Sequence, residues 1–350
     1  MVSEAISGRP EAQWDGCQVF YPQALPTGRP KRLLHVNGVT SPYANQLRDL
    51  EVLVWQTVEH PFDIVGIHNS TAGFQADFLE CLLQRAELAQ FLQPDEAART
   101  RLKGYAAMLT SLSQTDLDPN ADILKEVQSR RSGSLAPTTS LDPEFIRSLP
   151  FLQKMDLAEL SSYFYQDYPA GAPRPTLRLA YEIIKALRDG AEVFVLAHSQ
   201  GTLIAAVVFH ILTQFFGDYE RWTLPIRFIG YGPVILFEEL PTAIRRQTVL
   251  IQNRNDPVAE SFSNLRNVSA WSNLQAQVRR VLERAEELTR LINTESHHSS
   301  SFYLGLTGHA YSDRSLKLIQ TLLCEDWQHS SLLQALKATR VTLEDSGAGG

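Results

Sequence analysis

Ser199 stands in a pentapeptide that could make its hydroxyl a nucleophile. The pentapeptide, residues 197–201, reads AHSQG. It directly follows an apolar stretch, EVFVLA at 192–197, which predicts a buried strand. It directly precedes another apolar stretch, 200–216, which predicts a core helix. A serine on the turn between such a strand and such a helix is typical of a nucleophile elbow, and the alternative is that Ser199 only caps the helix.

The turn itself restricts which side chains can stand beside the serine. Only small residues fit two positions before and two positions after it, and Ala197 and Gly201 meet that demand. The backbone of Ser199 is expected to be strained, with its hydroxyl open at the carboxyl end of the sheet. The first helical amide, that of Gln200, is then the predicted donor to an oxyanion. His198 adjoins the serine and is assigned to packing or to an elbow contact.

An acid and then a base are expected further along the chain, in that order. Asp256 is the predicted acid, because it comes just after the predicted strand 248–253 and Pro257 stiffens its loop. A turn-forming Asp-Pro pair is the alternative interpretation. Other candidate acids are Glu238, Glu239 and, less favoured, Asp218.

The base is expected beyond Asp256, where the candidates are His297, His298, His309 and His329. His309 is predicted, because it stands in a loop just before the predicted helix 312–323 and could swing towards the nucleophile. His297 and His298 stand in a serine-rich segment that suggests solvent exposure, and His329 comes after that helix.

A second oxyanion donor is expected in the loop after an early strand. Strand 32–36 is followed by Asn37 and Gly38, and the glycine permits a close backbone approach. The amide of Val39 is therefore the predicted donor. An ordinary Asn-Gly turn is the alternative, and the polar run 68–71 after the next strand is read as a structural turn.

Strands and helices alternate along most of the chain, which predicts a mostly parallel sheet covered on both faces. The predicted domain spans 17–340, with a helical insertion or cap at 93–173 and flexible ends at 1–16 and 341–350. Predicted strands are 17–21, 32–36, 62–67, 192–197, 226–231 and 248–253. Predicted helices are 43–59, 73–91, 95–111, 120–129, 142–166, 176–188, 200–216, 236–246, 271–293 and 312–323.

Composition narrows the partners and the compartment. Of 350 residues 20% are charged, the net charge is -7 and there is no long basic run, so a nucleic-acid partner is not expected. Three widely spaced cysteines form no metal motif, and no secretory signal opens the chain, so we expect a reduced, cytoplasmic protein. Residues 193–216 are apolar, but the polar residues of the elbow interrupt them, so no transmembrane segment is expected. Peripheral contact with a membrane surface is compatible with the sequence.

With these motifs placed, the chain resembles the α/β-hydrolase superfamily, and within it lipase- and esterase-like members with an HSQG elbow. The resemblance covers about 32–72 and 174–325, and departs from the usual pattern where Ala197 replaces the first elbow glycine and Asn37 replaces the histidine of many lipases. It implies an α/β-hydrolase-like fold, a triad of Ser199, Asp256 and His309, and no metal or organic cofactor.

The leading functional hypothesis is a serine hydrolase that cleaves small-molecule or lipid esters through an acyl-enzyme, with lipases among the candidates. Thioesterase or amidase activity would use the same three residues, because the fold does not choose among them. A non-catalytic interaction protein of the same fold is the other hypothesis.

Overall fold

A seven-stranded sheet organises the chain, in the strand order β1-β3-β2-β4-β5-β6-β7. The computed structural model describes residues 16, 18–21, 30–60, 62–71, 74–130, 174–217, 220–259, 297–308, 310–327, 336 and 339–343. The strands are β1 (Gln18–Tyr21), β2 (Lys31–Val36), β3 (Asp63–Ile67), β4 (Glu192–His198), β5 (Ile226–Tyr231), β6 (Thr248–Asn253) and β7 (Thr339–Leu343). β1 is antiparallel to β3, and the other six strands are parallel to one another.

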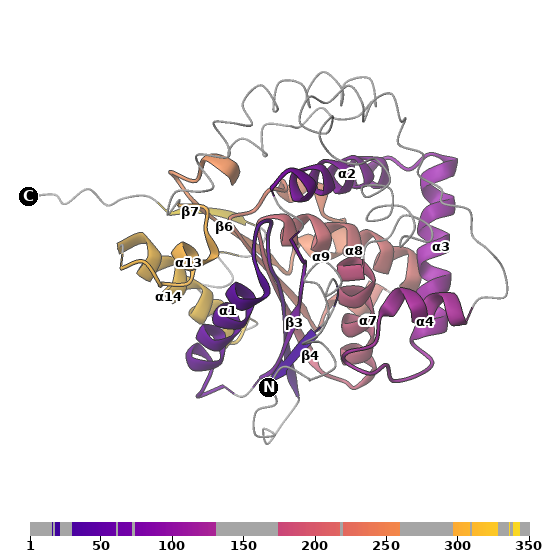
Figure 1. Cartoon of the computed structure of the whole chain (residues 1–350), viewed down its shortest axis with the longest axis horizontal. Helices are drawn as coiled ribbons and strands as arrows, with labels where there is room; N and C mark the ends of the chain where they lie inside the picture. The colour runs from indigo at the N-terminus through magenta and orange to yellow at the C-terminus, as the bar shows by residue number, and fades with distance from the viewer. Residues whose placement is uncertain are drawn as a thin grey trace, which may run out of the picture.

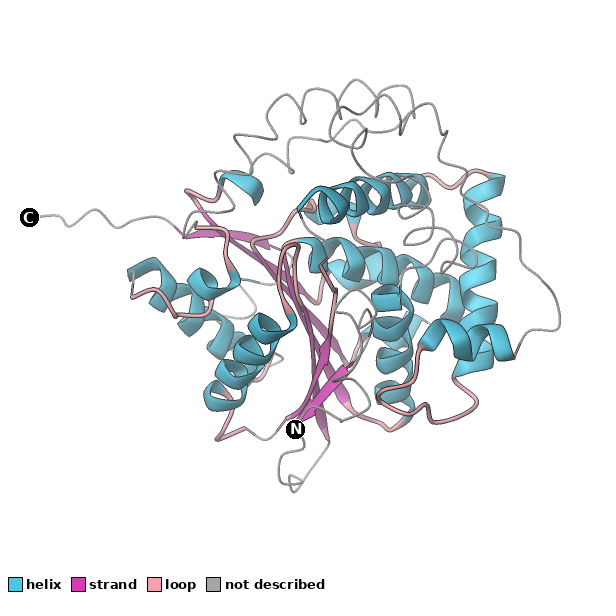
Figure 2. Ribbon diagram, viewed as in Figure 1, coloured by secondary structure: helices cyan, strands magenta, loops and turns pink. Residues whose placement is uncertain are grey.

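Helices cover both faces of this sheet (Figure 1). The helices are α1 (Tyr43–Gln56), α2 (Phe74–Leu92), α3 (Glu96–Leu112), α4 (Ile123–Ser129), α7 (Arg174–Arg188), α8 (Gln200–Phe216), α9 (Thr242–Arg245), α13 (Ser300–Tyr303) and α14 (Ala310–Cys324), with short 3-10 turns η5 (Glu220–Thr223) and η6 (Phe237–Glu239). Figure 2 shows α1, α13 and α14 on one side of the strands and the larger helical layer on the other.

Two hydrophobic cores follow from this layering. One lies between the sheet and helices α2, α3, α4, α7 and α8, and the other between the sheet and helices α1 and α14. The central strand β4 is buried on both faces, which explains its uninterrupted apolar sequence. The predicted fold class is therefore confirmed as an α/β architecture, a mostly parallel sheet covered by helices on both faces, and the strand order is consistent with an α/β-hydrolase-like fold.

The predicted insertion at 93–173 is described only in its first half. There α3 and α4 bury side chains such as Leu102, Tyr105 and Leu109 in the same core as α7 and α8. That half flanks the sheet as part of the main domain. Residues 131–173 lie outside the described residues, as do the predicted helices 142–166 and 271–293, and the cap stays a prediction.

The predicted flexible end at 341–350 is wrong in its first three residues. β7 runs from Thr339 to Leu343 and pairs in parallel with β6. Its alternation of polar and apolar residues fits an edge strand with one face on the core. Over the described ranges, no helix has the length and hydropathy needed to span a membrane.

Candidate active site

The backbone of Ser199 has the strained geometry of a strand-to-helix elbow. Ser199 lies between β4 and α8 with φ 49° and ψ −119°. Residues with a side chain rarely adopt this conformation, so the surroundings must hold it. Its amide donates to the carbonyl of Tyr231 at 3.2 Å. Its carbonyl accepts from the amide of Thr202 at 2.9 Å and from the Thr202 hydroxyl at 2.6 Å. The elbow is thus anchored on both sides at the carboxyl edge of the sheet.

Small residues around the elbow leave the turn its space. A Cβ at Gly201 would lie 2.5 Å from a carbonyl oxygen of β2, and a Cβ at Gly38 would lie 2.7 Å from Cβ of Ser199. Real side chains do not approach so closely, so glycine is required at both positions. Ala197 is fully buried and is paired in the sheet with Gly230. On the β5 side no side chain therefore stands beside Ala197, and its methyl group is accommodated where the usual pattern has glycine.

The imidazole that meets Ser199 belongs to His298. Its Nε2 lies 2.7 Å from Oγ of Ser199, and its Nδ1 lies 2.9 Å from each carboxylate oxygen of Asp256. His298 is only 4% exposed, so the expectation that it faces solvent is wrong. His309, the predicted base, lies outside the described residues. Among the described residues it is His298 whose imidazole contacts Ser199, so we assign to His298 the position that the sequence analysis gave to His309.

Hydrogen bonds turn the serine-rich loop of His298 inward. The hydroxyl oxygen of Ser299 accepts from the amide of Phe302 at 3.2 Å and caps α13. The side-chain amide of Asn253 donates to the carbonyl of His297 at 3.3 Å. These serines and histidines look solvated by composition, but they cap a helix and meet the end of β6. The polarity of the loop therefore satisfies internal partners, which composition alone could not reveal.

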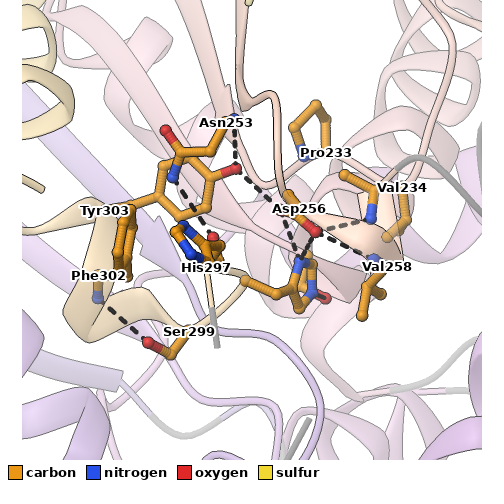
Figure 3. A network of polar contacts seen from close by, with 12 residues as sticks. Pro233, Val234, Asn253, Asp256, Val258, His297, Ser299, Phe302 and Tyr303 are labelled. Atoms are coloured by element: carbon orange, nitrogen blue, oxygen red, sulfur yellow. Dashed lines mark hydrogen bonds and ion pairs between the residues drawn. The ribbon is translucent and has the colours of Figure 1, made fainter. Parts of the chain in front are cut away.

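Asp256 lies just beyond β6 and is fully buried. One carboxylate oxygen accepts from the amides of Val258 at 3.1 Å and Ala259 at 2.9 Å, so Asp256 also caps a short helical turn. The other accepts from the hydroxyl of Tyr303 at 2.8 Å, and that hydroxyl accepts from the amide of Asn253 at 2.9 Å (Figure 3). The turn-forming and acid interpretations of Asp256 are thus compatible.

The environment keeps Asp256 ionised and Tyr303 protonated. Burial alone would raise the pKa of Asp256. The imidazole of His298 and the hydrogen bonds that the carboxylate of Asp256 accepts outweigh burial and bring this pKa below its ordinary value. Burial, together with the nearby Asp256 carboxylate, raises the pKa of Tyr303 well above its ordinary value. Tyr303 is therefore a hydrogen-bond donor to Asp256, and Asp256 can orient and stabilise an imidazolium at His298.

His198 connects the elbow to the loop that carries His298. Its Nε2 lies 2.7 Å from the main-chain carbonyl oxygen of His298. Burial, assisted by the neighbouring His298, lowers the pKa of His198 to about 3, so its imidazole is neutral. Because a carbonyl can only accept, Nε2 of His198 carries the proton and donates it. The expected elbow contact of His198 is thus a hydrogen bond to the main chain of His298.

The two predicted oxyanion donors adjoin Ser199. Gln200 is the first residue of α8, and Val39 follows Gly38, whose backbone packs against Ser199. Across the described ranges, the backbone amides of Val39 and Gln200 carry no hydrogen bond to another protein group. Amides left free beside a candidate nucleophile can receive a developing negative charge on a substrate oxygen.

Asn37 fixes the turn that carries Val39. Its Oδ1 accepts from the amide of Asn69 at 2.7 Å, and its Nδ2 donates to the carbonyl of Asn69 at 2.7 Å and to that of Gly38 at 3.2 Å. We call this reciprocal pair the asparagine clamp. The side chain of Asn69 donates to Oε1 of Gln200 at 2.7 Å, and Gln200 donates to Gln84 at 3.2 Å. The clamp ties the carboxyl ends of β2 and β3 to α8 and α2.

The alternative candidates have other partners or lie outside the described residues. Glu239 pairs with Arg85 and accepts from the amide of Leu236, and Glu238 is exposed. The ring of His297 packs on Phe302 at a centroid distance of 4.6 Å. Asp218 and His329 lie outside the described residues. The polar run 68–71 has structural contacts, since His68 bonds Gln46, Asn69 forms the clamp and Thr71 bonds Asp77.

Sequence reasoning named His298 as a candidate but favoured His309, and it missed the contacts of Tyr303 and Asn69. One signal for His298 and Tyr303 is the apolar segment that follows His298, because Phe302, Tyr303 and Leu304 are all buried and pull the loop onto the core. No local signal marks Asn69, since its role depends on the register that sets β3 beside β2.

No family model, curated protein or solved structure matches this chain. Within the part of the chain that the structure describes, no group of three or more His, Cys, Asp or Glu side chains could hold a metal ion. The chemistry of the site is therefore argued from its own geometry.

Proposed function

We propose that this chain is a serine hydrolase of the α/β-hydrolase superfamily that cleaves carboxylic esters through an acyl-enzyme on Ser199. The observation that carries the proposal is the chain of contacts from Ser199 to His298 to Asp256, with a strained serine at its head. A serine that only capped α8 would need neither the strain nor the buried imidazole, and its side chain caps no amide of α8.

The geometry supports the following reaction. His298 Nε2 takes the proton of the Ser199 hydroxyl as its oxygen attacks the ester carbonyl carbon. The amides of Val39 and Gln200 donate to the resulting oxyanion. The intermediate then collapses, the bond to the alcohol breaks, and the alkoxide takes the proton from the imidazolium. Water repeats the sequence on the acyl-enzyme and releases the carboxylic acid, returning the proton to Ser199.

Asp256 supports both halves of this cycle. Its contact with Nδ1 of His298 holds the imidazole with Nε2 as the acceptor towards Ser199. Its own bonds from Val258, Ala259 and Tyr303 hold the carboxylate in place. The imidazolium that forms in each step is thereby paired with a fixed negative charge in a buried site.

Thioesters and amides would engage the same residues. We propose an ester in preference to an amide because an alkoxide leaving group demands less of the general acid than the amine of an amide does, and a thioester is the alternative substrate for the same chemistry. Small-molecule esters and acyl lipids, the latter implying a lipase with peripheral membrane contact, both remain within the proposed substrate class. A non-catalytic protein of this fold is the alternative hypothesis, and the complete set of contacts around Ser199 counts against it.

The test combines a fluorophosphonate probe with hydrolysis of p-nitrophenyl esters from short to long acyl chains. We expect the wild type to label and to hydrolyse at least one ester, and Ser199→Ala to lose both properties. Ser129→Ala, an exposed serine of α4, is the matched control and should retain both. A wild type that neither labels nor hydrolyses any ester, thioester or amide would refute the enzyme hypothesis in favour of an interaction protein.

A further inference from the structure

Thr40 is the second strained residue beside the nucleophile. Its φ is 51°, and among the described residues only Thr40 and Ser199 combine a positive φ with a side chain. A β-branched residue is especially disfavoured in this region. Strain of this kind persists only where neighbouring groups hold it, so the contacts of Thr40 are informative.

A buried carboxylate holds Thr40. Oδ2 of Asp77 accepts from the amide of Thr40 at 2.7 Å and from the hydroxyl of Thr71 at 2.7 Å. Asp77 is only 2% exposed and stands in the first turn of α2, where the positive end of the helix favours a negative charge. Hydrogen bonds to an ionised acceptor are stronger than neutral ones, particularly when water is excluded.

These contacts fix both peptide groups that flank Val39. The carbonyl of Gly38 accepts from Nδ2 of Asn37, which orients the peptide that carries the Val39 amide. The amide of Thr40 donates to Asp77, which orients the next peptide. Because peptide groups are planar and trans, an anchored Gly38 carbonyl directs the Val39 amide to the opposite side. Of the two amides that follow Gly38, that of Thr40 is bound to Asp77, whereas that of Val39 carries no bond to another described residue.

We propose that Asp77 is a positioning residue that holds the turn Gly38–Thr40 in the strained form that presents the Val39 amide to the oxyanion. The inference rests on the proposed function and names a residue that acts through the turn without touching substrate. It implies that Asp77 affects the transition state, where the oxyanion exists, far more than substrate binding.

The primary test compares Asp77→Ala and Asp77→Asn with wild type on the best p-nitrophenyl ester. Loss of one oxyanion donor costs about 10²-fold or more in kcat, so we expect such a fall for Asp77→Ala with KM changed less than about threefold. Asp77→Asn keeps a side-chain carbonyl that can accept from Thr40, and we expect it to recover most of the rate. Gln90→Ala, an exposed change on the same helix, should match wild type.

Two readouts separate positioning from a merely structural role. The affinity of a trifluoromethyl ketone, which forms an oxyanion on Ser199, should fall by the same factor as kcat/KM. The pH dependence of kcat/KM should keep its midpoints, because Asp256 and His298 are untouched. Thermal unfolding of each variant checks that it folds.

A double mutant keeps the proposal falsifiable if Asp77→Ala is unstable. Glycine accepts a positive φ, so Thr40→Gly removes the strain that Asp77 holds. We expect Asp77→Ala to lower the activity much less in the Thr40→Gly background than in the wild-type background. If Asp77 only anchored α2, its removal would lower the activity by the same factor in both backgrounds. If the wild type is active and Asp77→Ala keeps the full wild-type kcat, this inference alone is overturned. The same holds if Asp77→Ala lowers kcat by an equal factor with Thr40 and with Thr40→Gly. A wild type with no activity and no labelling would overturn the proposed function with it.

Discussion

Replacing His298 with alanine tests the central contact of the site. The substitution removes the 2.7 Å contact to Ser199 and both 2.9 Å contacts to Asp256. It leaves the main-chain carbonyl that accepts from His198, so the loop keeps that anchor. The variant therefore separates loss of the imidazole from loss of the loop.

The expected magnitude follows from what remains. Without a base, Ser199 keeps its proton, while the oxyanion donors still favour the transition state. Removal of the histidine from such a triad costs up to about 10⁶-fold in kcat, and we expect a fall of about 10⁴- to 10⁶-fold, or roughly 5–8 kcal/mol in the barrier. KM should change little, because the imidazole acts on the proton and not on the ground-state substrate.

Steady-state hydrolysis of a p-nitrophenyl ester, with active sites counted by fluorophosphonate labelling of the wild type, measures this effect. His60→Ala, at the opposite end of β3 from Ser199, is the matched control. His309→Ala tests the assignment that the sequence suggested. The reasoning would be refuted if the kcat of His298→Ala stayed within about tenfold of wild type, instead of falling by about 10⁴- to 10⁶-fold, while His309→Ala lost the activity.

Three further substitutions probe the surroundings of the site. Tyr303→Phe removes a hydrogen bond that lowers the pKa of Asp256, so acid inactivation in a pH profile of kcat/KM should move to higher pH, and thermal unfolding should show a loss of about 1–3 kcal/mol. Burial, opposed by weaker effects, raises the pKa of Asp49 to about 6, so the folded state resists ionisation and loses stability as pH rises from about 4 to about 6. Asp49→Asn lacks this ionisation, so its unfolding free energy relative to wild type should rise by about 3 kcal/mol as the pH increases from about 4 to about 6. Chemical denaturation at both pH values measures the two free energies, and a difference between variant and wild type that does not depend on pH would contradict this. Gly201→Ala would place a Cβ 2.5 Å from the Val36 carbonyl oxygen, so we expect at least about 1–3 kcal/mol of destabilisation together with loss of labelling, and a stable, fully labelled variant would contradict the elbow geometry.

Local patterns were sufficient for the fold class and for two of the three residues in the contact chain Ser199–His298–Asp256. The change from an apolar strand to an apolar helix around Ser199 is encoded within about 25 consecutive residues, the length of that strand and helix together. It can therefore be recognised without tertiary information. Asp256 likewise follows its strand directly in the sequence.

The position of His298 beside Ser199 could not be predicted in the same way. Whether a polar loop is solvated or buried depends on partners far away in the chain, here His198 and Asn253 for the loop of His298. Composition favoured exposure, and the tertiary contacts reversed it. The same argument applies to Asp77, whose importance depends on a strained backbone angle at Thr40 that the sequence does not display.

The asparagine clamp also bears on how the protein ages. An asparagine followed by glycine is the sequence most prone to deamidation, because the small glycine lets its amide nitrogen attack the side-chain carbonyl. In the folded chain the Asn37 side chain is held at both ends by Asn69 and is almost fully buried, which keeps it from that reaction. Each unfolding event releases it. Conversion to aspartate would set a carboxylate against the carbonyls of Asn69 and Gly38, where only a donor fits. The clamp thus makes the lifetime of the oxyanion turn depend on the fraction of time that the chain spends unfolded.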